Sequence, residues 1–416
     1  MRNVEQSVKL MMIAVVVGLM PGLGDQAAAK PLKVFILAGQ SNMQGHVNVS
    51  TFDSLADDPK TAPLLKEMRN ADGKPHVCRK VWISSIGCAG DDTAEQKGKL
   101  TAGFGASPSE IGPEFTFGIY MEKQLNEPIL IIKTSWGGKN LLGDFRPPSA
   151  GKRVFNDTFV KGWKGMGVDP VREAARHNSE LNGVYYRHMI EHVRKVLADI
   201  KRVVPDYDPK KGYELAGFVW FQGWNDLVDG WSYPNQNQPG GYDEYSQMLT
   251  LFIRDVRKDL SAPKMPFVIG VMGIGGVKED KRPGSQMYFR QSMAAPASLP
   301  EFKGNVIAVQ TAPFWSEELA AIEEKKGKVD QMRWLLGVKD KNTPNADGKM
   351  TAARIDEYMK NYEAKLISPA EVALWQRGAS NGGYHYLGAA KIMAPIGKAF
   401  AEAMVKLQTT QRDEKQ

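Results

Sequence analysis

The chain has 416 residues, of which 42% are hydrophobic and 24% charged, and its formal net charge is +7. This is the composition of a globular protein that can bury a large core, and outside the N-terminus no apolar stretch is long enough to span a membrane. Lys and Arg are spread along the sequence without a basic run interleaved with aromatics, so nucleic-acid binding is not expected.

The first 29 residues are predicted to be a signal peptide. Arg2 and Lys9 give a positive start, an apolar run occupies residues 10–19, and small residues follow at 27–29. The apolar run is shorter than the roughly 20 residues of a membrane-spanning helix, although an uncleaved amphipathic anchor is the alternative. We therefore expect a mature chain from about Lys30 that is secreted or periplasmic and carries no membrane anchor.

After this segment, apolar β-rich runs alternate with segments of helical periodicity. The expected strands are residues 33–38, 81–86, 128–133, 215–221, 267–271 and 306–310, and the expected helices are 114–125, 181–204, 242–260 and 387–407. Such alternation predicts a parallel sheet covered by helices on both faces, as one domain over residues 30–408. We interpret 138–180 and 315–371 as insertions and 409–416 as a flexible tail.

A serine follows the first predicted strand directly, in the segment GQSNMQG at residues 39–45. In α/β sheets, ligands bind at the carboxyl ends of the strands. A serine at this turn projects its hydroxyl from the sheet edge, and the amides that open the next helix can donate to an oxyanion. Taken alone, the segment is equally consistent with a helix N-cap and a tight turn.

Five segments, in order, resemble the sialate O-acetylesterase-like group of the SGNH hydrolases, which includes carbohydrate esterase family 6. They are residues 39–45 (GQSNMQG), 111–115 (IGPEF), 134–138 (TSWGG), 220–226 (WFQGWND) and 384–388 (YHYLG). The resemblance implies a three-layer α/β/α sandwich of the flavodoxin-like SGNH type with a central parallel sheet. It also implies a serine esterase that hydrolyses acetyl esters on a poly- or oligosaccharide, without metal or organic cofactor.

The same resemblance implies roles for individual residues. Ser41 is the nucleophile, and His385 is the general base. The oxyanion hole consists of the Ser41 and Gly112 amides and the Gln222 side chain, and Asn42 fixes the turn or the acetyl group. With an ordinary histidine pKa of about 6.5, activity is expected to rise as His385 loses its proton.

One position departs from the family pattern. The aspartate that usually lies three residues before the histidine is replaced by Gly382. The histidine is then oriented by Asn381, by a carboxylate from elsewhere, with Glu114, Asp226 and Asp347 as candidates, or by no third residue. The sequence leaves these alternatives open.

Two other function classes remain open. The first is a non-catalytic carbohydrate-binding relative, which the Gly382 departure favours. The second is a zinc hydrolase that uses His188, Glu191 and His192, whose spacing matches an inverted zinc-peptidase motif, although a packing or surface role is expected for the histidines.

The only two cysteines, Cys78 and Cys88, either form a disulfide around the 81–86 strand or stay as free thiols. Without a nearby histidine pair, they are not expected to hold zinc.

Overall fold

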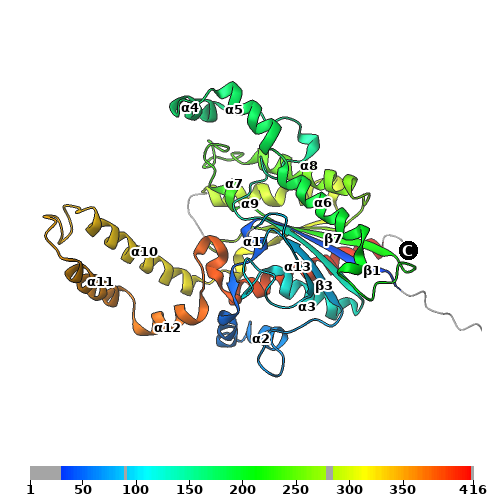
Figure 1. Ribbon diagram of the computed structural model, residues 1–416, viewed down its shortest axis with the longest axis horizontal. Helices are drawn as coiled ribbons and strands as arrows, with labels where there is room; N and C mark the ends of the chain where they lie inside the picture. The colour runs from blue at the N-terminus through cyan, green and yellow to red at the C-terminus, as the bar shows by residue number, and fades with distance from the viewer. Residues whose placement is uncertain (1–29, 89–90, 278–283, 414–416) are drawn as a thin grey trace, which may run out of the picture. The chain divides into compact units, whose positions relative to one another are not determined.

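The first strand lies at the centre of the molecule's sheet. In the computed structural model, which describes residues 30–88, 91–277 and 284–413, seven strands pair in the order β4-β3-β6-β1-β7-β8-β9 (Figure 1). Neighbours run parallel except β3 and β4. The strands are β1 (Leu32–Gly39), β3 (Val81–Ile86), β4 (Glu95–Lys99), β6 (Ile129–Ser135), β7 (Tyr213–Phe221), β8 (Phe267–Val271) and β9 (Val306–Gln310). A separate two-stranded sheet pairs β2 (Val47–Asn48) with β5 (Glu110–Ile111).

The strands form where apolar residues run without interruption. β1, β3, β6 and β8 are buried almost throughout, which a parallel sheet with both faces covered requires. The expected α/β class is therefore confirmed, and the sheet is mostly parallel, with β4 as the antiparallel exception. The edge strand β4 was not predicted, because its sequence EQKGK is polar and carries no apolar alternation.

Helices lie on both sides of this sheet. Helix α3 packs against α13 and β6, and Figure 1 shows α6 and α8 on the other side of the sheet. The helices are α1 (Ser41–Gln44), α2 (Ala62–Met68), α3 (Pro113–Leu125), α4 (Asp157–Gly165), α5 (Pro170–Arg176), α6 (Val184–Ala198), α7 (Trp224–Leu227), α8 (Asp243–Asp259), α9 (Ser285–Ala294), α10 (Glu317–Gly337), α11 (Ala352–Leu366), α12 (Pro369–Gly378) and α13 (Ala390–Asp413).

The register of the central strands determines which loops meet. Gly39 at the end of β1 pairs with Ser135 of β6 and with Phe221 of β7. These three strands therefore end at the same level, and the segments that follow them lie together at one edge of the sheet.

The chain from Pro31 onwards forms one compact unit, and the predicted signal peptide, residues 1–29, lies outside the described residues. The first expected insertion contains α4 and α5; the second contains α10 and α11 and ends within the first turn of α12. Helix α13 continues to Asp413, so the first five residues of the expected tail are helical. Their helix is held by the Gln411 side chain, which donates to the Lys264 carbonyl at 2.8 Å.

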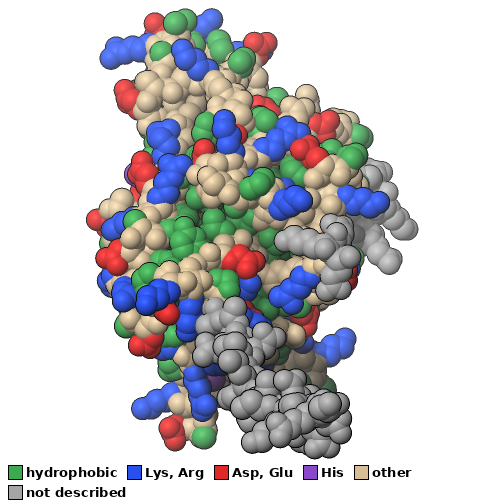
Figure 2. All heavy atoms as spheres, turned by 90° about the vertical axis from the view of Figure 1, so that its right-hand side faces the viewer, with side chains coloured by type: hydrophobic (Ala, Val, Ile, Leu, Met, Phe, Trp, Pro, Cys, Tyr) green, Lys and Arg blue, Asp and Glu red, His purple; other side chains and the backbone are tan. Residues whose placement is uncertain are grey.

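Across the described residues, none of the helices combines the length and apolar content that a membrane span requires. On the face shown in Figure 2, Lys and Arg side chains are interspersed with Asp and Glu.

The two cysteines are free and buried. Cys78 precedes β3 and Cys88 follows it, and a six-residue strand spans about 20 Å, well beyond the reach of a disulfide. The disulfide alternative is therefore wrong.

Candidate active site

Ser41 begins the short helix α1, immediately after β1. The Met43 and Gln44 amides donate to the Gln40 carbonyl at 2.8 and 2.9 Å. Within the described residues, the Ser41 amide has no acceptor, as expected at a helix start. The turn depends on Gly39, because a Cβ there would lie 2.1 Å from the Phe221 carbonyl oxygen.

Gln40 links this turn to the segment after β7. Its buried Oε1 accepts hydrogen bonds from the Gly223 amide at 3.0 Å and from Gln222 Nε2 at 3.1 Å. Its Nε2 donates to Asn225 Oδ1 at 2.8 Å and lies 3.5 Å from Ser41 Oγ. The Ser41 turn is thus fixed to a neighbouring strand by a buried side chain.

His385 lies in a tight turn between α12 and α13. Its Nδ1 is 3.1 Å from Asn381 Oδ1, which also accepts the Gly382 amide at 2.8 Å. The amide contact identifies this Asn381 atom as the oxygen, so Nδ1 of His385 carries the proton and Nε2 is left as a base. Among the alternatives that the sequence left open, Asn381 is the residue in hydrogen-bond contact with His385 within the described part of the chain.

The imidazole of His46 stacks on that of His385, with ring centroids 3.9 Å apart and an interplanar angle of 4°. Burial, followed by the neighbouring His46, lowers the pKa of His385 to about 3. Burial also lowers the pKa of His46. Both rings are therefore neutral at neutral pH, and the expected His385 pKa near 6.5 is corrected downward.

The backbone of the histidine turn is strained and tightly held. Tyr386 and Leu387 have φ angles of 54° and 61°, which are unusual for residues with a Cβ. The buried Tyr386 hydroxyl accepts the Gly273 amide at 2.9 Å and lies 2.8 Å from Thr311 Oγ1. These contacts stabilise the conformation that presents His385.

The structure brings the two motifs together. The turn Gly383–Gly388 contacts helix α1, which begins at Ser41. Ser380 supports this arrangement, since its hydroxyl accepts the Asn48 amide at 3.1 Å and donates to the Gly388 carbonyl at 2.8 Å. Asn42 is 4% exposed, and its buried Oδ1 has no hydrogen-bond partner within the described residues.

Two of the expected oxyanion donors are occupied by other acceptors. The Gly112 amide donates to Glu114 Oε1 at 2.9 Å. Gln222 Nε2 donates to Asp226 Oδ2 at 2.6 Å and to the Lys139 carbonyl at 3.1 Å. In this conformation neither group is available to an oxyanion at Ser41.

Gly137 lies closer to Ser41 than was recognised from the sequence. A Cβ built on Gly137 would be 4.0 Å from Ser41 Cβ and 3.1 Å from Gln44 Oε1. The TSWGG segment could have indicated this proximity, because it follows β6, and β6 ends at the same level as β1. No side chain other than glycine fits this close approach without moving Gln44.

The two carboxylates offered as orienting residues face elsewhere. Glu114 forms an ion pair with Lys133, with Oε2 and Nζ 2.8 Å apart and both side chains fully buried. Burial raises the pKa of Glu114, and Lys133 opposes that rise. Within the described residues no hydrogen bond or ion pair joins Glu114 to His385, so the expectation that Glu114 orients the histidine is corrected. Its partner Lys133 donates to the carbonyl of Gln44, the last residue of α1, at 2.7 Å.

Asp226 is also fully buried and accepts three hydrogen bonds, from the Leu141 amide at 2.9 Å, Gln222 Nε2 at 2.6 Å and the Tyr233 hydroxyl at 2.9 Å. Burial raises its pKa to about 6, while the donors hold it down. Its oxygens are used in joining the segments after β6 and β7, and it does not contact His385 in the described part of the chain.

This network gives a stability prediction. Asp226→Asn replaces one accepting oxygen by an NH₂ group and leaves a buried donor unsatisfied, so we expect the free energy of unfolding to fall by about 1–3 kcal/mol. Urea denaturation of the variant and the parent measures the difference. Asp243→Asn is the control, since Asp243 is exposed and the change should alter the free energy little. Equal midpoints for Asp226→Asn and the parent would contradict the account.

The alternative zinc site at the α6 histidines does not form. His192 is buried, with Nε2 2.9 Å from Ser84 Oγ, and burial lowers its pKa to about 4. His188 packs against Trp136 with ring centroids 6.3 Å apart, and its Nδ1 is 3.9 Å from Glu191. The described residues contain one group of three possible metal ligands, and these histidines are not part of it.

Three solved structures are similar in part. They are a protein of Arabidopsis thaliana (17% identity, TM-score 0.37, covering 68% of this chain and 86% of that one), a carbohydrate acetylesterase from Xanthomonas citri (14%, 0.38, 68% and 51%) and NanS (14%, 0.37, 70% and 79%). The chain thus spans about half the length of the Xanthomonas citri protein. No curated protein sequence matches it.

A family model does match, over residues 31–311. The matched region includes Ser41, Gly137 and Gln222, and His385 lies beyond it. Because the match covers more than half of the 416 residues, the chain belongs to the family described as carbohydrate esterase, sialic acid-specific acetylesterase.

Proposed function

We propose that this protein is an exported O-acetylesterase of the SGNH type, with a three-layer α/β/α architecture, that removes acetyl groups from a poly- or oligosaccharide by a Ser41–His385 mechanism. The observation that carries the proposal is the meeting of the Ser41 helix with the turn that holds His385 and Asn381. The Asn381 contact favours the tautomer in which Nε2 is the base, and Ser41 follows a strand at the end of the sheet where α/β proteins bind ligands; both support the proposal.

In the proposed reaction, Nε2 of His385 takes the proton of Ser41 as Oγ attacks the acetyl carbonyl. The Ser41 amide and, in place of Gly112, the Gly137 amide donate to the oxyanion. When the intermediate collapses, the ester C–O bond breaks and the sugar oxygen takes the proton from His385. Water then attacks the acetyl-serine with His385 as base, and acetate leaves while Ser41 regains its proton.

Aromatic side chains beside His385 suit a sugar substrate. The Tyr384 ring lies 4.4 Å from that of His385 and 6.3 Å from that of Trp224. Tyr384 is 48% exposed, whereas Trp136, another aromatic residue after a strand end, is only 1% exposed and packs internally. We therefore assign sugar stacking to Tyr384 and Trp224.

The histidine stack predicts an unusual pH profile. With a His385 pKa of about 3, kcat/KM should stay nearly constant from pH 7 to about pH 5 and fall only in more acidic solution. His46→Ala removes the stacked ring and lets water reach His385, so the acidic limb should move toward the ordinary histidine pKa of about 6.5. His46→Phe keeps the stacking and should move the limb less. An acidic limb near pH 6.5 in the parent would contradict this assignment.

The same pKa shift affects stability. Because the folded pKa of His385 lies below that of the unfolded chain, acid protonates the unfolded state first. The contribution of neutral, buried His385 to the free energy of unfolding is therefore complete above about pH 6.5 and is lost as the pH falls toward 3.

Acetate release tests the function directly. Residues 30–416 should release acetate from acetylated oligosaccharides and from an aryl acetate, and should act more slowly on longer acyl esters. Release from aryl acetate with none from any acetylated carbohydrate would point to a different ester substrate. Carbohydrate binding without any release would favour the non-catalytic relative.

A further inference from the structure

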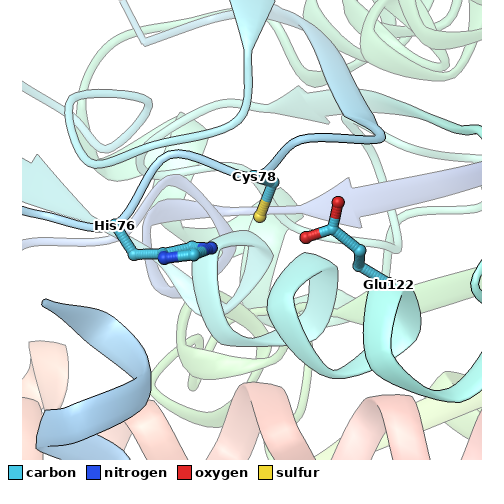
Figure 3. A group of neighbouring side chains, drawn as sticks. All are labelled: His76, Cys78 and Glu122. Carbon is cyan, nitrogen blue, oxygen red and sulfur yellow. The ribbon is translucent and has the colours of Figure 1, made fainter. Parts of the chain in front are cut away.

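His76, Cys78 and Glu122 form a cluster outside the candidate active site. Their nitrogen, sulfur and oxygen donor atoms all lie within 4.8 Å of one another. Figure 3 shows the Cys78 thiol and the Glu122 carboxylate pointing toward each other, with the His76 ring beside them. We propose that these three side chains bind a divalent zinc ion.

The ligand set suits zinc in particular. Thiolate, imidazole and carboxylate are all common zinc ligands, and a thiolate disfavours Mg²⁺ and Ca²⁺. Ligands of a tetrahedral zinc lie about 3.5 Å apart, so the cluster needs only a small side-chain contraction. A thiolate and a carboxylate together neutralise the two positive charges, and water completes the fourth position.

The Glu122 carboxylate is oriented by a backbone amide and, within the described residues, forms no ion pair with Lys or Arg. Glu122 Oε1 accepts the Lys80 amide at 2.5 Å, and the Cys78 thiol also hydrogen-bonds to the Glu122 carboxylate, so a metal here would replace the thiol proton. Three lysines lie nearby, but Lys80 Nζ binds Asn126 at 2.8 Å and Lys99 Nζ binds the Arg79 carbonyl.

The third lysine, Lys123, pairs with Glu67. Within the described residues, no Lys or Arg forms an ion pair with Glu122. The His76 ring likewise has no hydrogen-bond partner there, while the His76 backbone is held by the bond from its amide to the Met68 carbonyl at 2.8 Å.

The location indicates a structural role. Cys78 precedes β3, whereas Ser41 follows β1. Because β3 and β1 run in the same direction, the cluster lies at the N-terminal ends of the strands and Ser41 lies at their C-terminal ends. Along α3, Glu122 is about 12 Å from Glu114, and Glu114 is the residue that lies beneath the Ser41 turn. A zinc here would join the loop before β3 to the C-terminal end of α3 and take no part in ester hydrolysis.

Cobalt substitution tests the site without relying on activity. The full mature chain, stripped by chelator and loaded with Co²⁺, should show a sulfur-to-cobalt charge-transfer band and should bind about one zinc per chain. Cys78→Ser should abolish the band. Cys88→Ser is the matched control, since Cys88 is also a free buried thiol but lies beyond the other end of β3.

Glu122→Gln provides a second variant, because its amide oxygen can still accept the Lys80 amide. This variant should lower zinc affinity by roughly 100-fold or more. Removing a residue that only supports a metal ligand usually costs about 10–100-fold, and losing the ligand itself should cost more. Zinc should raise the melting temperature of the parent and of Cys88→Ser, but not that of Cys78→Ser. No bound zinc in the parent, or a cobalt band that survives Cys78→Ser, would overturn the proposal, whatever the esterase assay shows.

Discussion

Ser41→Ala should lower kcat/KM for acetyl ester hydrolysis by roughly 10⁴-fold or more. The substitution removes the oxygen that forms the acetyl-enzyme, and no neighbouring group can replace it. The fold should tolerate the change, because within the described residues Ser41 Oγ has one weak side-chain contact, to Gln40 Nε2 at 3.5 Å. Steady-state hydrolysis of an aryl acetate, with circular dichroism as a check on folding, measures the effect.

Ser50→Ala is the matched control, since Ser50 is exposed just beyond the same turn and should leave the rate within about twofold of the parent. A folded Ser41→Ala variant that keeps a tenth of the parental rate would exclude Ser41 as nucleophile.

His385→Ala should lower kcat/KM by roughly 10³–10⁴-fold, because general-base activation of Ser41 and protonation of the leaving sugar both depend on it. In the Ser41→Ala background the same substitution should cause little further loss, since the two residues act as a unit and their effects are not additive. The measurement is kcat/KM for the two single variants and the double variant. If the two losses multiply, the residues act independently and the proposed pairing is wrong.

Substitutions at Asn381 test the orientation of His385 separately from its role as general base. Asn381→Ala removes the acceptor at Nδ1 and should cost less than loss of His385. Asn381→Asp places a carboxylate there, which favours the imidazolium and should move the acidic limb of the pH profile upward. An unchanged profile in Asn381→Asp would show that the Asn381 contact does not act on His385.

The sequence predicted the parts of the fold that depend on local pattern. β3, β8 and β9 have the expected bounds, because each is a short apolar run between turn residues. β4 was not visible in the sequence, since its pairing with β3 is a property of the edge of the sheet and leaves no apolar pattern. The tail from 409 was expected to be flexible because it is charged, yet the helix continues through it to Asp413.

For the candidate site, the sequence identified the segments but not the direction of each polar group. Ser41 and His385 could be paired because each lies in a motif of the same family. Whether Gly112 faces the serine or a carboxylate depends on how Glu114 packs, which spacing does not encode. The His46–His385 stack was likewise unpredictable, because it joins residues 339 positions apart (385 minus 46).

The most direct test of the central claim uses a serine-reactive probe, because it does not depend on the natural substrate. Residues 30–416 are treated with a fluorophosphonate, digested and mapped by mass spectrometry. The account predicts one stoichiometric adduct on Ser41, absent from Ser41→Ala and formed at least about 100-fold more slowly in His385→Ala. Labelling of another serine, or labelling of Ser41 at an undiminished rate in His385→Ala, would contradict it.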